Sequence, residues 1–124
     1  METIVFSYGG VVGGMRSINY SEGTLVVYKK FEAIKRRTGL NLTWFWEEID
    51  HIGVWEWQSS YDCPGFLDGI QWELYLRRGD KQMESFGSNL FPPNVRFLAR
   101  VKSPSFKRLC TAIDHLVGHP FIPY

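Results

Sequence analysis

The sequence predicts an α+β fold, in which an antiparallel sheet of about five to six strands carries two helices packed on it. Three observations lead to this prediction. Apolar and polar residues alternate with a period of two in several short segments. Two other segments, one that ends at about Ile52 and one over 104–117, have the 3.6-residue period of amphipathic helices. Strands and helices come in blocks rather than in regular alternation, which is typical of α+β proteins. A length of 124 residues suits one domain, and we expect a single domain over residues 1–124.

The first third of the chain has the pattern of a β-meander. Ile4, Phe6 and Tyr8 alternate with smaller or polar residues. A second strand is predicted over 15–20, and a turn of Ser, Glu and Gly separates it from a third strand over 24–31, which is rich in β-branched and aromatic residues.

Two segments in this region lack a clear strand pattern. The sequence GGVVGG at 9–14 predicts a bend, a bulge or a close backbone approach, and its spacing does not match a phosphate-binding loop. The segment 32–40 contains Lys35, Arg36 and Arg37. We interpret it as a solvated connection, and the alternative is a basic edge that meets an acidic partner.

The first helix is predicted to begin just after Asn41 or Thr43 and to run to about Ile52. Asn41 or Thr43 can cap its N-terminus, and Gly53 ends it at the position where a left-handed residue is favoured. The apolar side chains repeat at the spacing of one helix face, at Phe45, Ile49 and Ile52.

A strand is predicted over 54–61, and it carries two of the five tryptophans. Trp55 and Trp57 would share one face of this strand. Glu56 and Gln58 lie on the opposite face, which is too polar for a core. We therefore expect both indoles to point inward, and an outward aromatic platform is the alternative.

The segment 70–77 has the clearest strand pattern, with one face made of Ile70, Trp72, Leu74 and Leu76. A hairpin turn over 78–81 leads to a strand over 82–86. The segment 95–101 alternates and is interpreted as a strand or a short helix.

The last helix has clear signals at both ends. Ser103 is the expected N-cap, Pro104 occupies the first helical position, and Gly118 ends the helix. Its apolar face consists of Phe106, Leu109, Cys110, Ile113, Leu116 and Val117. This pattern favours packing on a sheet, with Cys110 as a small core residue.

Charge and cysteine content restrict the functional classes. The formal net charge is +1, which disfavours a general nucleic-acid binder because such proteins usually have a basic excess. The N-terminal segment METIVFSYGG resembles neither a signal peptide nor a membrane span. We interpret Cys63 and Cys110 as reduced thiols and expect a cytoplasmic protein with no membrane partner.

Catalytic motifs are not recognisable in the sequence. His115 and His119 have the spacing of a metal-binding pair, but Gly118 interrupts the helix between them and a third ligand is missing. We therefore expect no metal and no cofactor, and an enzyme is the less favoured interpretation.

Residues 55–93 resemble a pattern found in small uncharacterised bacterial proteins. The pattern consists of Trp-x-Trp, then Tyr61, then Asp68-Gly69-x-x-Trp72, and then Gly87-Ser88-Asn89 followed by Phe91-Pro92. This resemblance implies a bacterial or phage origin. It implies no activity and no site residues.

The leading hypothesis is a protein-binding module that acts by covering a partner protein, as immunity proteins and inhibitors of host defence do. A few Trp, Tyr and Arg side chains would contact the partner inside a polar rim. One of Trp44 and Trp46 is expected to hold the sheet margin and the other to be partly exposed. The candidate partner-binding residues are Trp44, Trp46, Tyr75, Arg77 and Arg78, with Lys35, Arg36 and Arg37 for electrostatic steering. The sequence is also compatible with a homodimer that forms through the sheet face.

Two alternatives remain open. One is a single-stranded nucleic-acid binder that uses aromatic and basic side chains on one sheet face, namely Tyr75, Arg77, Arg78, Lys81 and Phe86. The other is a small-molecule hydrolase or ligand carrier with a cleft beside Cys63 and Asp68.

Overall fold

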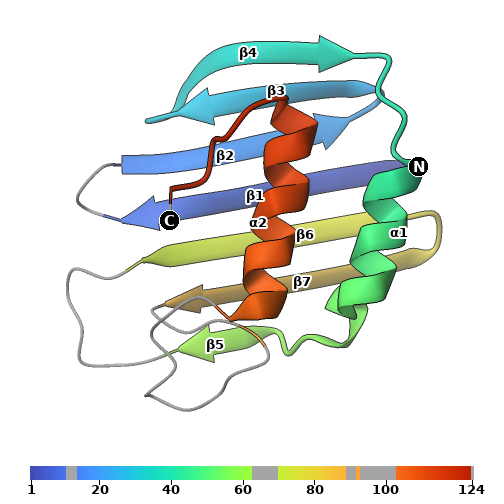
Figure 1. Ribbon diagram of the computed structural model, residues 1–124, viewed down its shortest axis with the longest axis vertical. Coiled ribbons are helices and arrows are strands. Elements are labelled where there is room, and N and C mark those ends of the chain that lie inside the picture. Colours follow the sequence, from blue (N-terminus) through green and yellow to red (C-terminus); the bar gives the residue numbers. More distant parts are fainter. Residues whose placement is uncertain (11–13, 63–69, 89–91, 93–102, 124) are drawn as a thin grey trace.

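The alternating N-terminal residues form the central strand of the sheet. The computed structural model describes residues 1–10, 14–62, 70–88, 92 and 103–123 (Figure 1). Within these residues the strands are β1 (Glu2–Gly10), β2 (Gly14–Ser21), β3 (Thr24–Lys29), β4 (Glu32–Thr38), β5 (Ser60–Asp62), β6 (Gln71–Arg78) and β7 (Lys81–Ser88). The helices are α1 (Thr43–Ile52) and α2 (Pro104–Val117).

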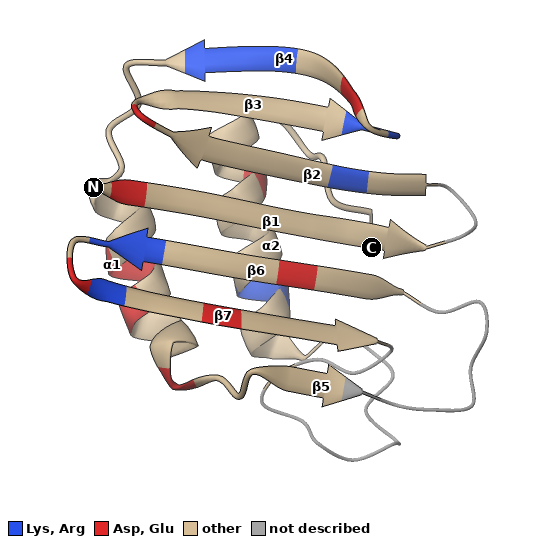
Figure 2. Cartoon of the chain, turned by 180° about the vertical axis from the view of Figure 1, so that it is seen from behind, with Lys and Arg blue, Asp and Glu red and all other residues tan. Residues whose placement is uncertain are grey.

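The described strands form one seven-stranded sheet in the order β4-β3-β2-β1-β6-β7-β5. Neighbouring strands are antiparallel, except that β5 pairs with β7 in parallel. Both helices cover one face of the sheet (Figure 1), and the opposite face is seen in Figure 2 without a covering helix. The α+β prediction is confirmed, and the sheet has more strands than expected.

The additional strand is β4, which corrects the interpretation of 32–40 as a solvated connection. Residues Glu32–Thr38 pair with β3 and form an edge of the sheet, with a bulge opposite Val27 and Tyr28. Lys35 and Arg37 point toward the helix layer, where they donate to carbonyl oxygens of α2. Because these cations find acceptors in the fold, the basic run is compatible with a strand.

The prediction of a strand over 54–61 is wrong for most of that segment. Gly53 ends α1 with a left-handed φ of 82°, and a 3₁₀ turn follows over Val54–Glu56. The Trp55 indole donates to the Asp50 carboxylate at 2.7 Å and stacks on Trp46 at 6.1 Å. These contacts override the strand propensity of the tryptophans. Both Trp55 and Trp57 are partly buried against the core, as the inward interpretation expected.

The helix boundaries agree with the sequence signals. Ser103 accepts from the backbone N–H of Phe106, and Pro104 is at the start of α2. The N-cap of α1 is Leu42 rather than the expected residues, but the Asn41 side chain accepts from the N–H of Thr43 at 3.0 Å. The Asn41 side chain therefore still accepts a hydrogen bond from a backbone N–H group of the first turn.

The core lies between the sheet and the two helices. Alternate residues of β1 and β6 point into it, together with the apolar face of α2. Phe106 of α2 lies against Trp72 of β6 with ring centroids 5.1 Å apart. Cys110 is buried, as expected. The core assignments from the helix and strand periods are therefore confirmed for these elements.

Several predicted features lie outside the described residues. These are the segment 95–101, Cys63 and Asp68, so the proposed cleft beside the last two residues has no structural description. Among the described residues, no helix combines the length and apolar character needed to cross a membrane.

Gly9 allows a close approach between β1 and β2. A Cβ at this position would lie 2.4 Å from the Gly14 carbonyl oxygen and 2.8 Å from Met15 Cα. We expect Gly9→Ala to lower the free energy of unfolding by about 2–3 kcal/mol, because the backbone of β2 would have to move away from the added methyl group. Urea unfolding measures this loss. Gly23→Ala is the control, because its φ of 81° is also positive but its added Cβ meets open space, so its loss reports the backbone strain alone. An equal loss in the two variants would contradict the close-approach explanation.

Tyr8 provides a pH test of the core. Burial raises the pKa of Tyr8 from 10.0 to about 12, with a smaller electrostatic contribution from Cys110. The unfolded chain releases this proton near pH 10 while the folded chain retains it. Stability is therefore unaffected by this group below pH 10 and decreases between pH 10 and 12, by about 2–3 kcal/mol. Tyr8→Phe should flatten this decrease in urea unfolding, and an unchanged profile would contradict the assignment.

Candidate functional site: a groove between the two helices

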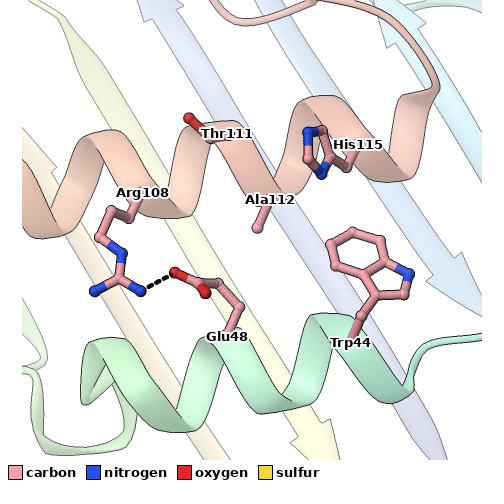
Figure 3. A pocket seen from close by; sticks show the side chains of 6 residues that line it. All are labelled: Trp44, Glu48, Arg108, Thr111, Ala112 and His115. Carbon is pink, nitrogen blue, oxygen red and sulfur yellow. Dashed lines mark ion pairs between the residues drawn. The ribbon is translucent and has the colours of Figure 1, made fainter.

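A groove runs between α1 and α2 on the outer surface of the helix layer. Figure 3 shows the two helices side by side, with side chains from both facing the space between them. The hollow has a volume of about 420 Å³. Its lining residues are Trp44, Glu48, Arg108, Thr111, Ala112 and His115.

The sequence builds this groove by helical spacing. Trp44 and Glu48 are four residues apart, so they project from the same face of α1. On α2, Arg108 and His115 are two turns apart with Ala112 between them. The small side chain of Ala112 is buried at the floor, while the longer side chains form the walls (Figure 3).

Trp44 is the exposed aromatic side chain of the groove. Its exposed fraction is 37%, although it packs edge-on against Phe45 at 5.9 Å. The His115 ring lies 5.7 Å from the Trp44 ring, at an angle of 58°. One end of the groove therefore consists of an indole and an imidazole that present both apolar surface and hydrogen-bonding atoms.

An ion pair closes the other end. Arg108 and Glu48 approach to 2.6 Å, and their side chains are 47% and 33% exposed. Because solvent screens a pair of this exposure, it stabilises the fold by less than about 1 kcal/mol. Its main effect is to place an acidic group on the α1 wall opposite a basic group on the α2 wall (Figure 3).

A second hollow of about 420 Å³ adjoins the groove and shares Thr111 and His115 with it. It extends along α2 to the C-terminal segment, with Asp114, Gly118, His119 and Pro120 as its further lining residues. The Asp114 carboxylate accepts from the N–H groups of Phe121 and Ile122, at 3.0 and 2.9 Å. These bonds hold the C-terminal segment in place, so the second hollow has a defined wall.

The lining of the groove combines apolar surface with hydroxyl and charged groups. Thr111 donates its hydroxyl to the Lys107 carbonyl at 3.0 Å, so it is not paired with a base. In the described part of the chain, no three His, Cys, Asp or Glu side chains are grouped to hold a metal ion. The exposed indole, the small floor and the two charged walls suit an apolar side chain with polar neighbours.

The expected split of Trp44 and Trp46 is confirmed, and Trp46 is the buried one, with an exposed fraction of 1%. Its indole N–H donates to the Glu2 carboxylate. The guanidinium of Arg78 lies 5.6 Å from the Trp46 ring, and Lys81 lies 4.7 Å from Trp55. Trp46 and Arg78 therefore belong to a structural cluster at the sheet margin, away from the groove.

Tyr75 and Arg77 lie on the open face of the sheet, because Trp72, Leu74 and Leu76 point to the helices. Phe86 of β7 is 50% exposed. Its register partner is Glu73, and that of Tyr75 is Glu84. The expectation that Arg78 and Lys81 share a face with Tyr75 and Phe86 is wrong, since strand alternation places them on the opposite face.

The three basic residues proposed for steering are also separated. Lys35 donates to the Val117 carbonyl at 2.6 Å, and Arg37 to the Leu116 carbonyl at 2.7 Å. Cations at this end of a helix also interact favourably with its dipole. Arg36 points to the opposite face and is exposed. Lys35 and Arg37 are thus engaged within the fold.

Sequence reasoning placed Trp44 among the binding residues but missed Glu48, Arg108 and Thr111, and considered His115 only as a metal ligand. The sequence does show the i, i+4 spacing of Trp44 and Glu48 and the i, i+7 spacing of Arg108 and His115. Nothing in the sequence showed that the two helices lie side by side. Pairing between distant segments is a tertiary property that one sequence does not display.

A scan of protein-family models and a search of curated proteins both found no match to this chain.

The different positions of Trp44 and Trp46 predict different mutational effects. Trp46→Ala removes a buried indole and should lower the free energy of unfolding by about 3–5 kcal/mol. Trp44→Ala should cost less, on the order of 1–2 kcal/mol, because more than a third of this side chain is already in water. Urea unfolding of both variants measures the difference. Similar losses in the two variants would contradict the assignment of Trp44 to an accessible surface.

Proposed function

We propose that this protein is a small binding module whose partner protein docks on the groove between α1 and α2. The observation that carries the proposal is the exposed Trp44 indole beside a small buried floor and a cross-helix ion pair. Tryptophan and arginine are the side chains most enriched among residues that dominate binding energy. Such residues act best where surrounding contacts exclude water, and a groove provides this condition.

The charges of the groove favour one orientation of the partner. The α1 wall carries Glu48, whereas the α2 wall carries Arg108. A docked segment would therefore place a basic group toward α1 and an acidic group toward α2, with an apolar side chain between them. Opposed charges of this kind fix register and increase the association rate.

The partner would be a surface helix or loop of another protein. The protein would act by covering that partner, in the manner of an immunity protein or an inhibitor of host defence in a bacterial or phage system. This assignment is supported by the small size, the absence of a recognised catalytic motif and the aromatic content of 16%.

The experiment is affinity capture from a lysate of the source organism, at high salt and with nuclease, followed by quantitative mass spectrometry. The bait is the full chain or its Trp44→Ala variant. We expect one protein to be retained by the wild type and reduced at least about tenfold by the variant, which corresponds to the loss of one dominant contact. Calorimetry with the purified partner would then measure the affinity.

The matched control is Phe86→Ser, which removes an exposed aromatic side chain from β7 on the open face. This variant should retain the partner at the wild-type level. Equal capture by the wild type and Trp44→Ala would contradict docking at the groove. Recovery of nucleic acid at low salt and its loss at high salt would favour the nucleic-acid alternative.

A further inference from the structure

The hairpin between β3 and β4 exposes an apolar side chain far from the groove. Phe31 is 84% exposed at its tip, and Ile34 is 51% exposed on β4. Both values exceed the 37% of Trp44. Folding gains almost no hydrophobic stabilisation from Phe31, because nearly all of its surface stays in water.

The backbone at this tip is unfavourable for the residues that occupy it. Lys30 and Phe31 have φ values of 52° and 68°, in the region where glycine and asparagine are favoured. Two successive residues with positive φ make a tight hairpin turn that usually carries Asn-Gly or Gly-Gly. A bulky aromatic residue that is exposed in this conformation adds backbone strain with almost no burial to offset it.

Neighbouring contacts hold the tip in this position. The N–H of Lys30 donates to the Met15 carbonyl at 2.8 Å. The aliphatic stem of Lys30 lies on Gly14, where an added Cβ would be 2.9 Å from its Cγ. The hairpin is therefore anchored to β2, and Phe31 is presented on a fixed support.

Basic residues precede this apolar tip and follow it along β4. Residues 29–37 contain five Lys or Arg side chains and one carboxylate, Glu32. Lys29, Lys30 and Arg36 are exposed, whereas the other two cations cap α2. Figure 2 shows basic residues on β4 and at the β3 end, with the acidic Glu32 at the start of β4, while β6 and β7 carry residues of both signs.

We propose that the tip formed by Lys29, Lys30 and Phe31, with Arg36 behind it, docks on an anionic lipid surface. An apolar side chain within a basic rim matches the boundary between acyl chains and anionic headgroups. Each cation near such a surface adds to the attraction. Lysine is depleted in protein interfaces, so a lysine-rich rim favours lipid over a second protein. This proposal departs from the sequence-based expectation of no membrane partner.

The test is co-sedimentation with vesicles of 70% phosphatidylcholine and 30% phosphatidylserine, with pure phosphatidylcholine vesicles for comparison. We expect weak binding to the anionic vesicles at low salt and its loss in 0.5 M NaCl, because screening removes the attraction of the cations. Absence of binding to the anionic vesicles at low salt would overturn the proposal, as would equal binding to both vesicle types.

Phe31→Gly is the decisive variant. Glycine suits the positive φ, so the melting temperature should rise by about 2–5 °C. The lipid partition coefficient should decrease on the order of tenfold, since the apolar insertion is lost. A purely structural role for Phe31 would not move stability and binding in opposite directions. Retained lipid binding by this variant would overturn the assignment of Phe31 as the inserting residue.

Two further variants complete the test. Lys30→Gln should reduce binding to the anionic vesicles without affecting the hydrophobic contact, and full retention would count against the basic rim. Phe86→Ser, on β7 at the other side of the sheet, should bind the vesicles like the wild type. A loss in Phe86→Ser equal to that in Phe31→Gly would overturn the location of the lipid site. All of these variants retain Trp44, so they should still capture the partner protein of the groove. The lipid proposal and the protein-binding proposal can therefore fail independently.

Discussion

The fold depends on the contact of one aromatic ring in α2 with the sheet. Phe106 lies within 5.1 to 6.3 Å of the rings of Phe6, Tyr8, Trp57 and Trp72, measured between centroids. These partners come from β1, from the segment after α1, and from β6. The contact therefore joins the N-terminal strand, the middle of the chain and the last helix in one cluster. Aromatic pairs contribute beyond the area that they bury, so removal of Phe106 would loosen all three regions together.

The other end of α2 is fixed by charge rather than by apolar packing. Lys35 and Arg37 of the edge strand donate to the last carbonyls of the helix, and Arg16 donates to the Phe121 carbonyl at 2.9 Å. The carbonyl groups at a helix C-terminus lack partners within the helix. Three cations from β2 and β4 thus satisfy acceptors at or just beyond the end of α2. This arrangement sets the position of α2 over the sheet, and with it the width of the groove that faces α1.

Most of the fold was predictable from local patterns. The periods of β1, β6 and α2, the proline at the start of α2 and the glycine at its end all gave the observed elements. The secondary-structure predictions were wrong where contacts with a distant segment override the local conformational preference of the residues. The basic run of β4 looked solvated because its acceptors lie about 80 residues away along the chain. The segment around Trp55 looked like a strand because the stacking of Trp55 on Trp46 is not visible in its own sequence. The candidate site follows the same rule, since only Trp44 was recognised from composition, and its companions depend on how two helices pair.

The strand order has a consequence for how the chain can fold during synthesis. Strands β1 to β4 form a meander with short connections, so they can pair soon after residue 38 has been made. The second edge of β1 then has no partner until β6 follows, because residues 71–78 occupy that edge in the native sheet. The apolar face of the meander also remains without α2 until residue 117. A nascent chain of this protein therefore carries an unpaired strand edge until residue 78 and an apolar surface without α2 until residue 117. Such intermediates are prone to aggregation, so the late segments limit both the folding rate and the yield of native protein.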